Sequence, residues 1–159
     1  MAVDRRPLVL TGAERAFLLD ARRIVLCTIA PDGSPRPVPA CFALAEADDG
    51  STRLYTPLDE KPKRVADPHF LARVHDIAAR PEVTLLADRW EEDWDNLAWI
   101  RLDGRAMLLE PGPDQWSGEE HASAVAALRS RYAQYSAHDL NGRPIIRVDL
   151  ISARSWGSI

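Results

Sequence analysis

Four residues that could bind a phosphate follow one short apolar segment of the chain. Leu54 to Thr56 reads as a strand that ends in the hydroxyl of Thr56, and Lys61, Lys63 and Arg64 follow within eight positions. Pro62 favours an extended backbone at the residue before it, which would let both lysines point the same way. Charge-assisted hydrogen bonds to phosphate are strong. The pattern indicates a phosphate clamp, and a solvated basic loop is the alternative.

The usual motifs of enzyme chemistry are missing from the sequence. No GxGxxG fingerprint, P-loop, HExxH or GxSxG motif is present, and the two cysteines lack metal-site spacing. Cys27 and Cys41 stand in apolar runs, which favours buried thiols. A phosphate clamp without an acid, a base or a nucleophile suits a protein whose phosphorylated cofactor carries the chemistry.

Composition limits the class of protein and its partners. The chain has 159 residues, 46% of them hydrophobic, which suits a single domain over residues 1–159 with a flexible N-terminus at 1–10. The formal net charge of −4 argues against nucleic-acid binding. No apolar run is long enough to span a membrane, and no signal peptide is evident, so we expect a cytoplasmic protein.

The elements expected to position the clamp are mostly strands. Continuous apolar runs at 24–29 and 83–87 predict strands that are buried on both sides. A turn at 31–35 leads to a strand over 36–44, whose Pro37 and Pro39 place its first half at an edge or bulge. Further strands are predicted at 53–56, at 97–109 with a bulge or bend at Gly104, and at 145–156.

Three helices complete the predicted elements. Thr11 and Glu14 form a capping box for a helix over 12–21, and Ser117 and Glu120 form a second one for a helix that ends near residue 132. Asp67 and Pro68 begin a helix that Pro81 ends. The order of six strands and three helices predicts a mainly β, α+β fold, an antiparallel barrel with peripheral helices.

Tryptophans gather around an acidic loop. Trp90, Trp94 and Trp99 fall within ten residues and flank Glu91 to Asp93. Large aromatic side chains beside an exposed loop are typical of an interface or a ligand wall. We therefore expect a two-fold homodimer.

The order of these motifs resembles the pyridoxamine 5′-phosphate oxidase-like split β-barrels. The resemblance rests on the strand at 24–30 with its turn, on Leu54 to Arg64, and on the segments 77–81 and 83–88. The segment 93–104, with Arg131-Tyr132 and Gln134-Tyr135, is similar to a branch of oxidoreductases that use the deazaflavin coenzyme F420.

This resemblance implies a six-stranded split β-barrel that forms a homodimer with the cofactor at the interface. The phosphate would be held by residues matching Thr56, Lys61 and Lys63, with Arg64 adjacent. The backbone of Arg36, Pro37 and Val38 would lie against the cofactor ring. Trp94 and Trp99 of the other subunit would close the site.

The resemblance favours an oxidoreductase that transfers a hydride from coenzyme F420 to a small conjugated substrate. The anionic tail of the coenzyme would favour cations, for which Arg36, Arg64 and Arg101 are candidates. An FMN-dependent enzyme of the same fold and a non-catalytic flavin or deazaflavin carrier or sensor are the alternatives. The residues that bind pyridoxamine phosphate at the C-terminus of the oxidase have no clear match, although Arg154 to Trp156 stand nearby.

Overall fold

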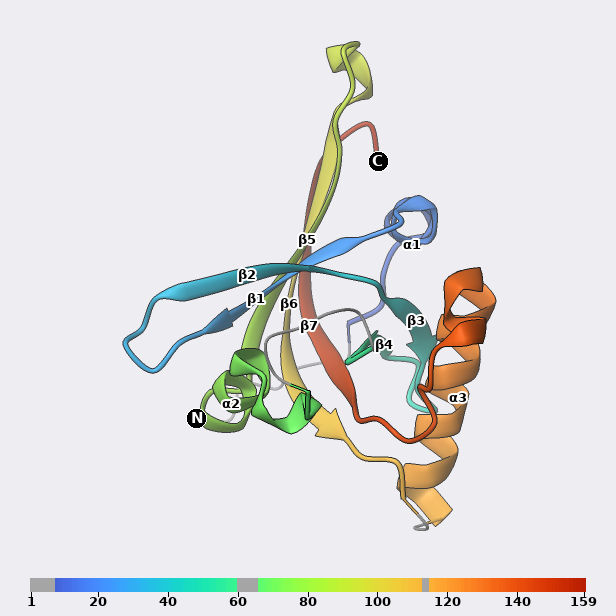
Figure 1. Ribbon diagram of the computed structural model, residues 1–159. Coiled ribbons are helices and arrows are strands. Elements are labelled where there is room, and N and C mark those ends of the chain that lie inside the picture. Colours follow the sequence, from blue (N-terminus) through green and yellow to red (C-terminus); the bar gives the residue numbers. More distant parts are fainter. Residues whose placement is uncertain (1–7, 60–65, 113–114) are drawn as a thin grey trace.

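Seven strands form one antiparallel sheet, and three α-helices lie against it (Figure 1). The computed structural model describes residues 8–59, 66–112 and 115–159, without the side chains of 115–117. The strands are β1 (Ile24–Ile29), β2 (Pro35–Ala40), β3 (Ala43–Glu46), β4 (Thr52–Pro57), β5 (Glu82–Arg89), β6 (Ala98–Leu109) and β7 (Ile145–Gly157). The helices are α1 (Gly12–Asp20), α2 (Ala72–Ala79) and α3 (Gln115–Arg131), with the 3₁₀ helices η1 (Pro68–Phe70), η2 (Trp94–Asn96) and η3 (Ala133–Ala137).

The sheet is open, and its order is β2-β1-β5-β6-β7-β4-β3. The predicted six-stranded barrel is corrected in two respects, because the sheet has seven strands and β2 and β3 are its unpaired edges. The predicted strand over 36–44 is interrupted at Cys41 and Phe42. Phe42 is fully buried, and its N–H donates to the Tyr132 hydroxyl (3.1 Å) instead of to a strand.

One face of the sheet is buried and the other is half-exposed. Along β1 the side chains of Ile24, Leu26 and Thr28 are buried, whereas those between them are only half-buried. The prediction of strands buried on both sides is therefore wrong for a single chain. We call the second face the outer face, and Leu86 on β5 is 39% exposed there. The outer face is mixed, because apolar side chains on β1 and β5 lie beside charged side chains on β6 and β7.

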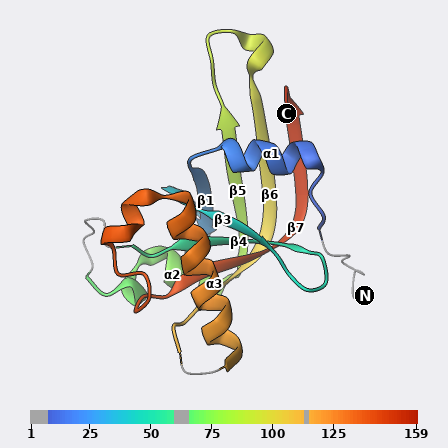
Figure 2. The same ribbon diagram turned by 90° about the vertical axis from the view of Figure 1, so that its right-hand side faces the viewer.

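Helix α1 lies across β5, β6 and β7 on the buried face (Figure 2). Its predicted capping box is confirmed, since the Thr11 hydroxyl accepts from the Glu14 N–H (3.2 Å) and the Glu14 carboxylate accepts from the Thr11 N–H (3.0 Å). Arg131 at the end of α3 donates to the carbonyls of Leu18 (2.9 Å) and Leu19 (3.0 Å). These bonds satisfy carbonyl groups that a helix end leaves without partners.

The other two helices differ from prediction at their beginnings. The segment after Asp67 first forms η1, and α2 begins only after Leu71. Helix α3 begins at Gln115, so Ser117 lies inside the helix and the second capping box is wrong. Helix α2 packs on β1 and β6, and α3 packs on β3 and β4.

The two longest neighbouring strands, β6 and β7, are bent by a bulge at the predicted position. The register shifts between Asp103 and Gly104, and Ile151 on β7 has no opposite residue. A Cβ at Gly104 would lie 2.6 Å from Cγ1 of Val148 and 2.7 Å from the carbonyl oxygen of Asp149. Glycine is needed here because the neighbouring strand leaves no room for a side chain.

Residues 8–10, the described end of the N-terminal stretch, contact the body of the protein. Leu10 is 9% exposed, and the carbonyl of Leu8 accepts a hydrogen bond from the N–H of Thr52 (3.1 Å). Residues 1–7 lie outside the described part of the chain. No helix in the described ranges is both long and apolar enough to cross a bilayer.

Candidate functional site

A cavity walled by tryptophans lies on the outer face where β5 and β7 end and β6 begins. It encloses about 480 Å³, a size typical of small-molecule sites. Trp99 and Trp156 are directly opposite each other in the β6–β7 ladder, and Trp90 continues the wall from the end of β5. We call this space the tryptophan cavity; its lining residues are Leu86, Asp88, Arg89, Trp90, Leu97, Ala98, Trp99, Arg101 and Trp156.

The hairpin that carries this cavity extends beyond the body of the molecule (Figure 1). Its tip is η2, which contains Trp94, and Asp93 caps η2 by accepting from the Asp95 N–H (3.1 Å). Trp94 is 73% exposed and Trp90 is 75% exposed. Such exposure of two indole rings on one projecting loop is unusual, since aromatic side chains are normally covered by protein or ligand.

The predicted strand-end hydroxyl lies in a second region, at the end of β4. Thr56 is 2% exposed, and the two residues after β4, Leu58 and Asp59, are also buried. Arg143 donates from Nε to the Leu58 carbonyl (2.6 Å) and from Nη2 to the Asp59 carbonyl (3.2 Å). Lys61, Lys63 and Arg64 follow immediately but lie outside the described residues, so the clamp stays a prediction.

Side chains around Asp59 fix the chain just before that basic segment. The Tyr135 hydroxyl donates to Oδ2 of Asp59 (2.7 Å), and burial together with hydrogen bonds to Cys41 and Asp59 raises the pKa of Tyr135. Burial lowers the pKa of Arg73, and the nearby Asp59 carboxylate partly offsets that effect. These contacts hold Asp59, the last described residue before the basic segment, against the body of the protein.

An exposed histidine anchors the chain after the basic segment. The two ring nitrogens of His69 lie 2.7 Å from Oδ1 of Asp67 and 2.7 Å from Oε1 of Glu110 at the end of β6. These hydrogen bonds raise the pKa of His69, and bonds from His69 lower the pKa of Asp67. The arrangement ties η1 to the end of β6 most strongly when the imidazole is protonated.

Strand β2, the third predicted region, is an edge strand as expected. Arg36 does not reach outward, because its Nη1 lies 3.1 Å from Oδ1 of Asp76 on α2. Asp76 is 1% exposed and also accepts from the Thr28 hydroxyl (2.8 Å). The guanidinium of Arg36 therefore neutralises a buried carboxylate.

The free edge of β2 offers hydrogen-bond acceptors only. Ala30 bonds to Ser34 in the hairpin, so alternate residues from Arg36 onward bond to β1. The residues that face outward are then Pro35, Pro37 and Pro39, which lack an N–H group. Pro37 presents a carbonyl to the edge, while Val38 packs its side chain against the core.

The tryptophan cavity and the β4 end are far apart in one chain. Thr56 is opposite Ile146 and Trp99 is opposite Trp156, ten residues further along β7. At the rise of an extended strand this is about 30 Å of chain. A single chain therefore does not bring Trp94 and Trp99 to Thr56.

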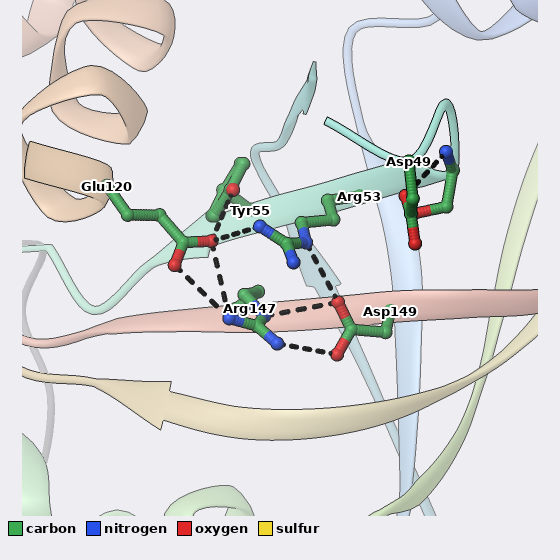
Figure 3. Close-up of polar contacts among 7 residues, drawn as sticks. Asp49, Arg53, Tyr55, Glu120, Arg147 and Asp149 are labelled. Carbon is green, nitrogen blue, oxygen red and sulfur yellow. Dashed lines mark hydrogen bonds and ion pairs between the residues drawn. The ribbon is translucent and has the colours of Figure 1, made fainter. Parts of the chain in front are cut away.

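A charge network that the sequence analysis missed joins α3 to β4 and β7 (Figure 3). Glu120 accepts from Arg53 (3.2 Å), from the Tyr55 hydroxyl (2.7 Å) and from Arg147 (3.1 Å). Asp149 bonds to the same two arginines, at 3.2 Å and 2.8 Å. The sequence held one signal for this network, namely the charged residues Arg53 on β4 and Arg147 and Asp149 on β7, because side chains on neighbouring strands interact.

Burial and hydrogen bonding shift the pKa values of two members of this network, Tyr55 and Arg147. Burial and the Glu120 carboxylate both raise the pKa of Tyr55, which keeps its hydroxyl a donor. Burial lowers the pKa of Arg147, but hydrogen bonds with Asp149 and the charge of Glu120 outweigh it, so the net change is upward. The network holds β4 in place and so positions the strand that ends at Thr56.

The described residues contain no group of three or more side chains suited to bind a metal ion. At the β4 end the Asp59 carboxylate accepts from the Tyr135 hydroxyl, and the tryptophan cavity carries the charged groups of Asp88, Arg89 and Arg101. What they present is a set of aromatic walls, anchored backbone and cations. This arrangement can hold a planar anionic molecule.

The sequence and the fold together place the chain in a known protein family. A family model for pyridoxamine 5′-phosphate oxidase matches residues 10–157, and the chain belongs to this family. No curated protein sequence matches it.

Solved structures share the fold at low identity. One is an FAD-binding protein from Mesorhizobium loti, with 21% identity, a TM-score of 0.58 and coverage of 92% of this chain and 94% of that one. Another is an F420 reductase, with 19% identity, a TM-score of 0.56 and coverage of 92% and 98%. A third is HutZ, the heme storage protein from Vibrio cholerae, with 14% identity, a TM-score of 0.60 and coverage of 94% and 95%. At these identities the likeness concerns the fold alone.

Proposed function

We propose that this protein is an oxidoreductase that uses the deazaflavin coenzyme F420 to transfer a hydride to a small conjugated substrate. The observation that carries the proposal is the tryptophan cavity. Its indole walls suit a planar ring, and its volume of about 480 Å³ lies in the range of cofactor and ligand sites. The described residues that line the cavity fit such a ring.

The chain's own residues would bind and orient the coenzyme. Thr56, Lys61 and Lys63 are the proposed phosphate ligands, and the chain has no other lysines than these two. The anchored backbone at Leu58 and Asp59 would fix where the basic segment begins. The coenzyme, when bound, supplies the hydride from its own ring, so the protein needs to position it and exclude water.

The β2 edge restricts how a ring can lie beside it. Because the outward groups are carbonyls, only N–H or O–H donors of a ligand can hydrogen-bond there. Pro37 is the central acceptor of this edge. The backbone contact proposed for Arg36, Pro37 and Val38 therefore becomes a contact with the carbonyl of Pro37.

We propose a homodimer because one chain does not assemble the site. Thr56 and Trp99 are separated by about 30 Å of strand, and a second copy could supply Trp94 and Trp99 to the first. The half-exposed outer face is the surface that such a copy would cover. The dimer would account both for the half-exposed outer face and for the projecting tryptophan loop.

Two other functions stay in competition on the same fold. An FMN-dependent enzyme would use the same phosphate ligands and the same aromatic walls. A non-catalytic carrier or sensor is favoured by the likeness to the heme storage protein, since the same fold serves storage there.

Titration of the purified protein with F420 and with FMN, followed by fluorescence quenching, separates these functions. Tighter binding of F420 supports the proposal, and tighter binding of FMN supports the second enzyme. Binding of F420 without reduction of any enone or quinone by the reduced coenzyme would support a carrier. Mass analysis of any small molecule that copurifies gives an independent answer.

A lysine substitution tests the phosphate ligands. Lys63→Ala should weaken binding of either phosphorylated cofactor roughly tenfold, because a charge-assisted hydrogen bond is lost. The stability of the fold should not change. Arg23→Ala is the matched control, since Arg23 is an exposed cation between α1 and β1, outside the basic segment. Equal binding by the two variants would refute the clamp.

A further inference from the structure

Two arginines face each other across β6 and β7 without a carboxylate between them. Arg101 and Arg154 are directly opposite in the ladder, and both are exposed. Neither makes a hydrogen bond or an ion pair with any residue in the described ranges. Like charges in opposite positions destabilise a sheet, so this pair opposes folding unless something else favours it.

The arginine pair borders the tryptophan cavity. The next pair on the same face, two residues along each strand, is Trp99 with Trp156. Arg101 itself lines the cavity. Two guanidinium groups and two indole rings therefore form adjoining rows on one surface.

The nearby charged groups do not satisfy the pair. Asp103 lies on the same face, but its oxygens accept from the hydroxyls of Thr84 (2.8 Å) and Ser152 (3.0 Å). Arg89, the other cation of the cavity, donates to the carbonyls of Asn96 and Ser158. Asp88 also lines the cavity, and within the described residues it forms no ion pair with Arg101 or with Arg154.

We propose that Arg101 and Arg154 form an anion subsite of the tryptophan cavity. It takes a carboxylate or phosphate group of a ligand whose planar part lies against Trp99 and Trp156. Guanidinium groups suit this task because their donors match the two oxygens of a carboxylate. The inference rests on the proposed function for the identity of the planar part and for the coenzyme tail as one source of the anion. The anion comes either from the acidic tail of the coenzyme or from a substrate carboxylate.

Paired probes distinguish the two sources. Coenzyme F420 is compared with its deazaflavin ring lacking the phosphate and glutamate tail, and cinnamate is compared with cinnamamide. Dissociation constants come from quenching of tryptophan fluorescence. Arg101→Gln and Arg154→Gln should each weaken binding of the charged probe roughly tenfold and leave the neutral probe unchanged. If the variants lose affinity only for F420, the anion is the tail of the coenzyme. If they also lose affinity for cinnamate, the anion is a substrate carboxylate.

Arg105→Gln is the matched control. Arg105 projects from the same strand and face but does not line the cavity, and it is paired with Glu82. This variant should bind every probe as the unchanged protein does. A second readout is thermal unfolding without ligand, where Arg154→Gln should raise the midpoint because a like-charge contact is relieved. A structural role for Arg154 would lower it.

Several results would overturn the subsite. The first is that the arginine variants bind the charged probes as tightly as the Arg105→Gln control does. The second is that the unchanged protein binds no charged probe. A change of sedimentation mass in the double variant without a change in ligand affinity would show that the pair serves a second copy of the chain. Failure of F420 and FMN to bind, with arginine-dependent binding of cinnamate, would refute the proposed function and keep the subsite.

Discussion

Arg36→Ala tests whether the contact of this arginine is structural. Its guanidinium lies 3.1 Å and 3.3 Å from the two oxygens of Asp76, which is 1% exposed. Without Arg36, the buried carboxylate retains one side-chain donor among the described residues, the Thr28 hydroxyl. Breaking a buried ion pair costs about 3–5 kcal/mol. Because the Arg36 side chain is 45% exposed, water can replace part of the contact, and we expect about 2 kcal/mol.

Urea unfolding of four proteins measures this quantity. The proteins are the unchanged chain, Arg36→Ala, Asp76→Ala and the double variant, and the coupling energy of the cycle should be about 1–2 kcal/mol. The unfolding temperature of Arg36→Ala should fall by about 4–8 °C for a chain of this size. Arg80→Ala is the control, because Arg80 is exposed at the end of α2, and it should change stability by less than about 0.5 kcal/mol.

Two results would refute the structural role of Arg36. If Arg36→Ala and Arg80→Ala unfold at the same urea concentration, the ion pair does not stabilise the protein in solution. If Arg36→Ala instead keeps its stability but loses affinity for F420, the side chain belongs to the cofactor site and the structural assignment is wrong.

Three further predictions concern the bulge, the histidine bridge and the charge network. Gly104→Ala should destabilise the protein by about 2–3 kcal/mol in urea unfolding, because its Cβ would meet a neighbouring strand. Gly12→Ala is the control: the space around it is open, so it should stabilise α1 by up to about 1 kcal/mol. Equal effects of the two variants on stability would contradict the geometry of the bulge. Because the pKa of His69 is raised in the folded protein, this residue adds stability that is complete below pH 6.5 and is lost as the pH rises through the pKa of the folded state. NMR titration should show that Glu110→Gln lowers the pKa of His69. An unchanged pKa would exclude the bridge. Tyr55→Phe should cost about 1–2 kcal/mol in urea unfolding, because its hydroxyl donates to a carboxylate on α3; an unchanged midpoint would argue against that bond.

Local sequence patterns predicted the positions of most elements. The strands at 24–29, 83–87 and 97–109 and the capping box at Thr11 follow from periodicity and from cap chemistry, which act over a few residues. The bulge at Gly104 also follows, since a glycine inside a strand often marks a bulge or the close approach of a neighbouring backbone.

The errors came from tertiary contacts. The strand over 36–44 is broken because Phe42 enters the core and bonds to Tyr132, a residue 90 positions away. Apolar runs predicted burial on both faces, but burial of the outer face depends on what lies against it. The ion pair between Arg36 and Asp76 was also missed, since nothing in the local pattern shows that Asp76 is the partner of this side chain.

The position of β7 between β6 and β4 has a consequence for how the protein folds. The β3–β4 hairpin has no neighbour in the described sheet other than β7, and Thr56 pairs with Ile146, which lies far along the sequence. Contacts of such long range slow folding, because the chain must close a large loop before they form. Until β7 arrives, the edges of β4 and β6 are both open to pairing with other chains. We therefore expect cellular chaperones to matter most for this protein during the interval before the last strand docks.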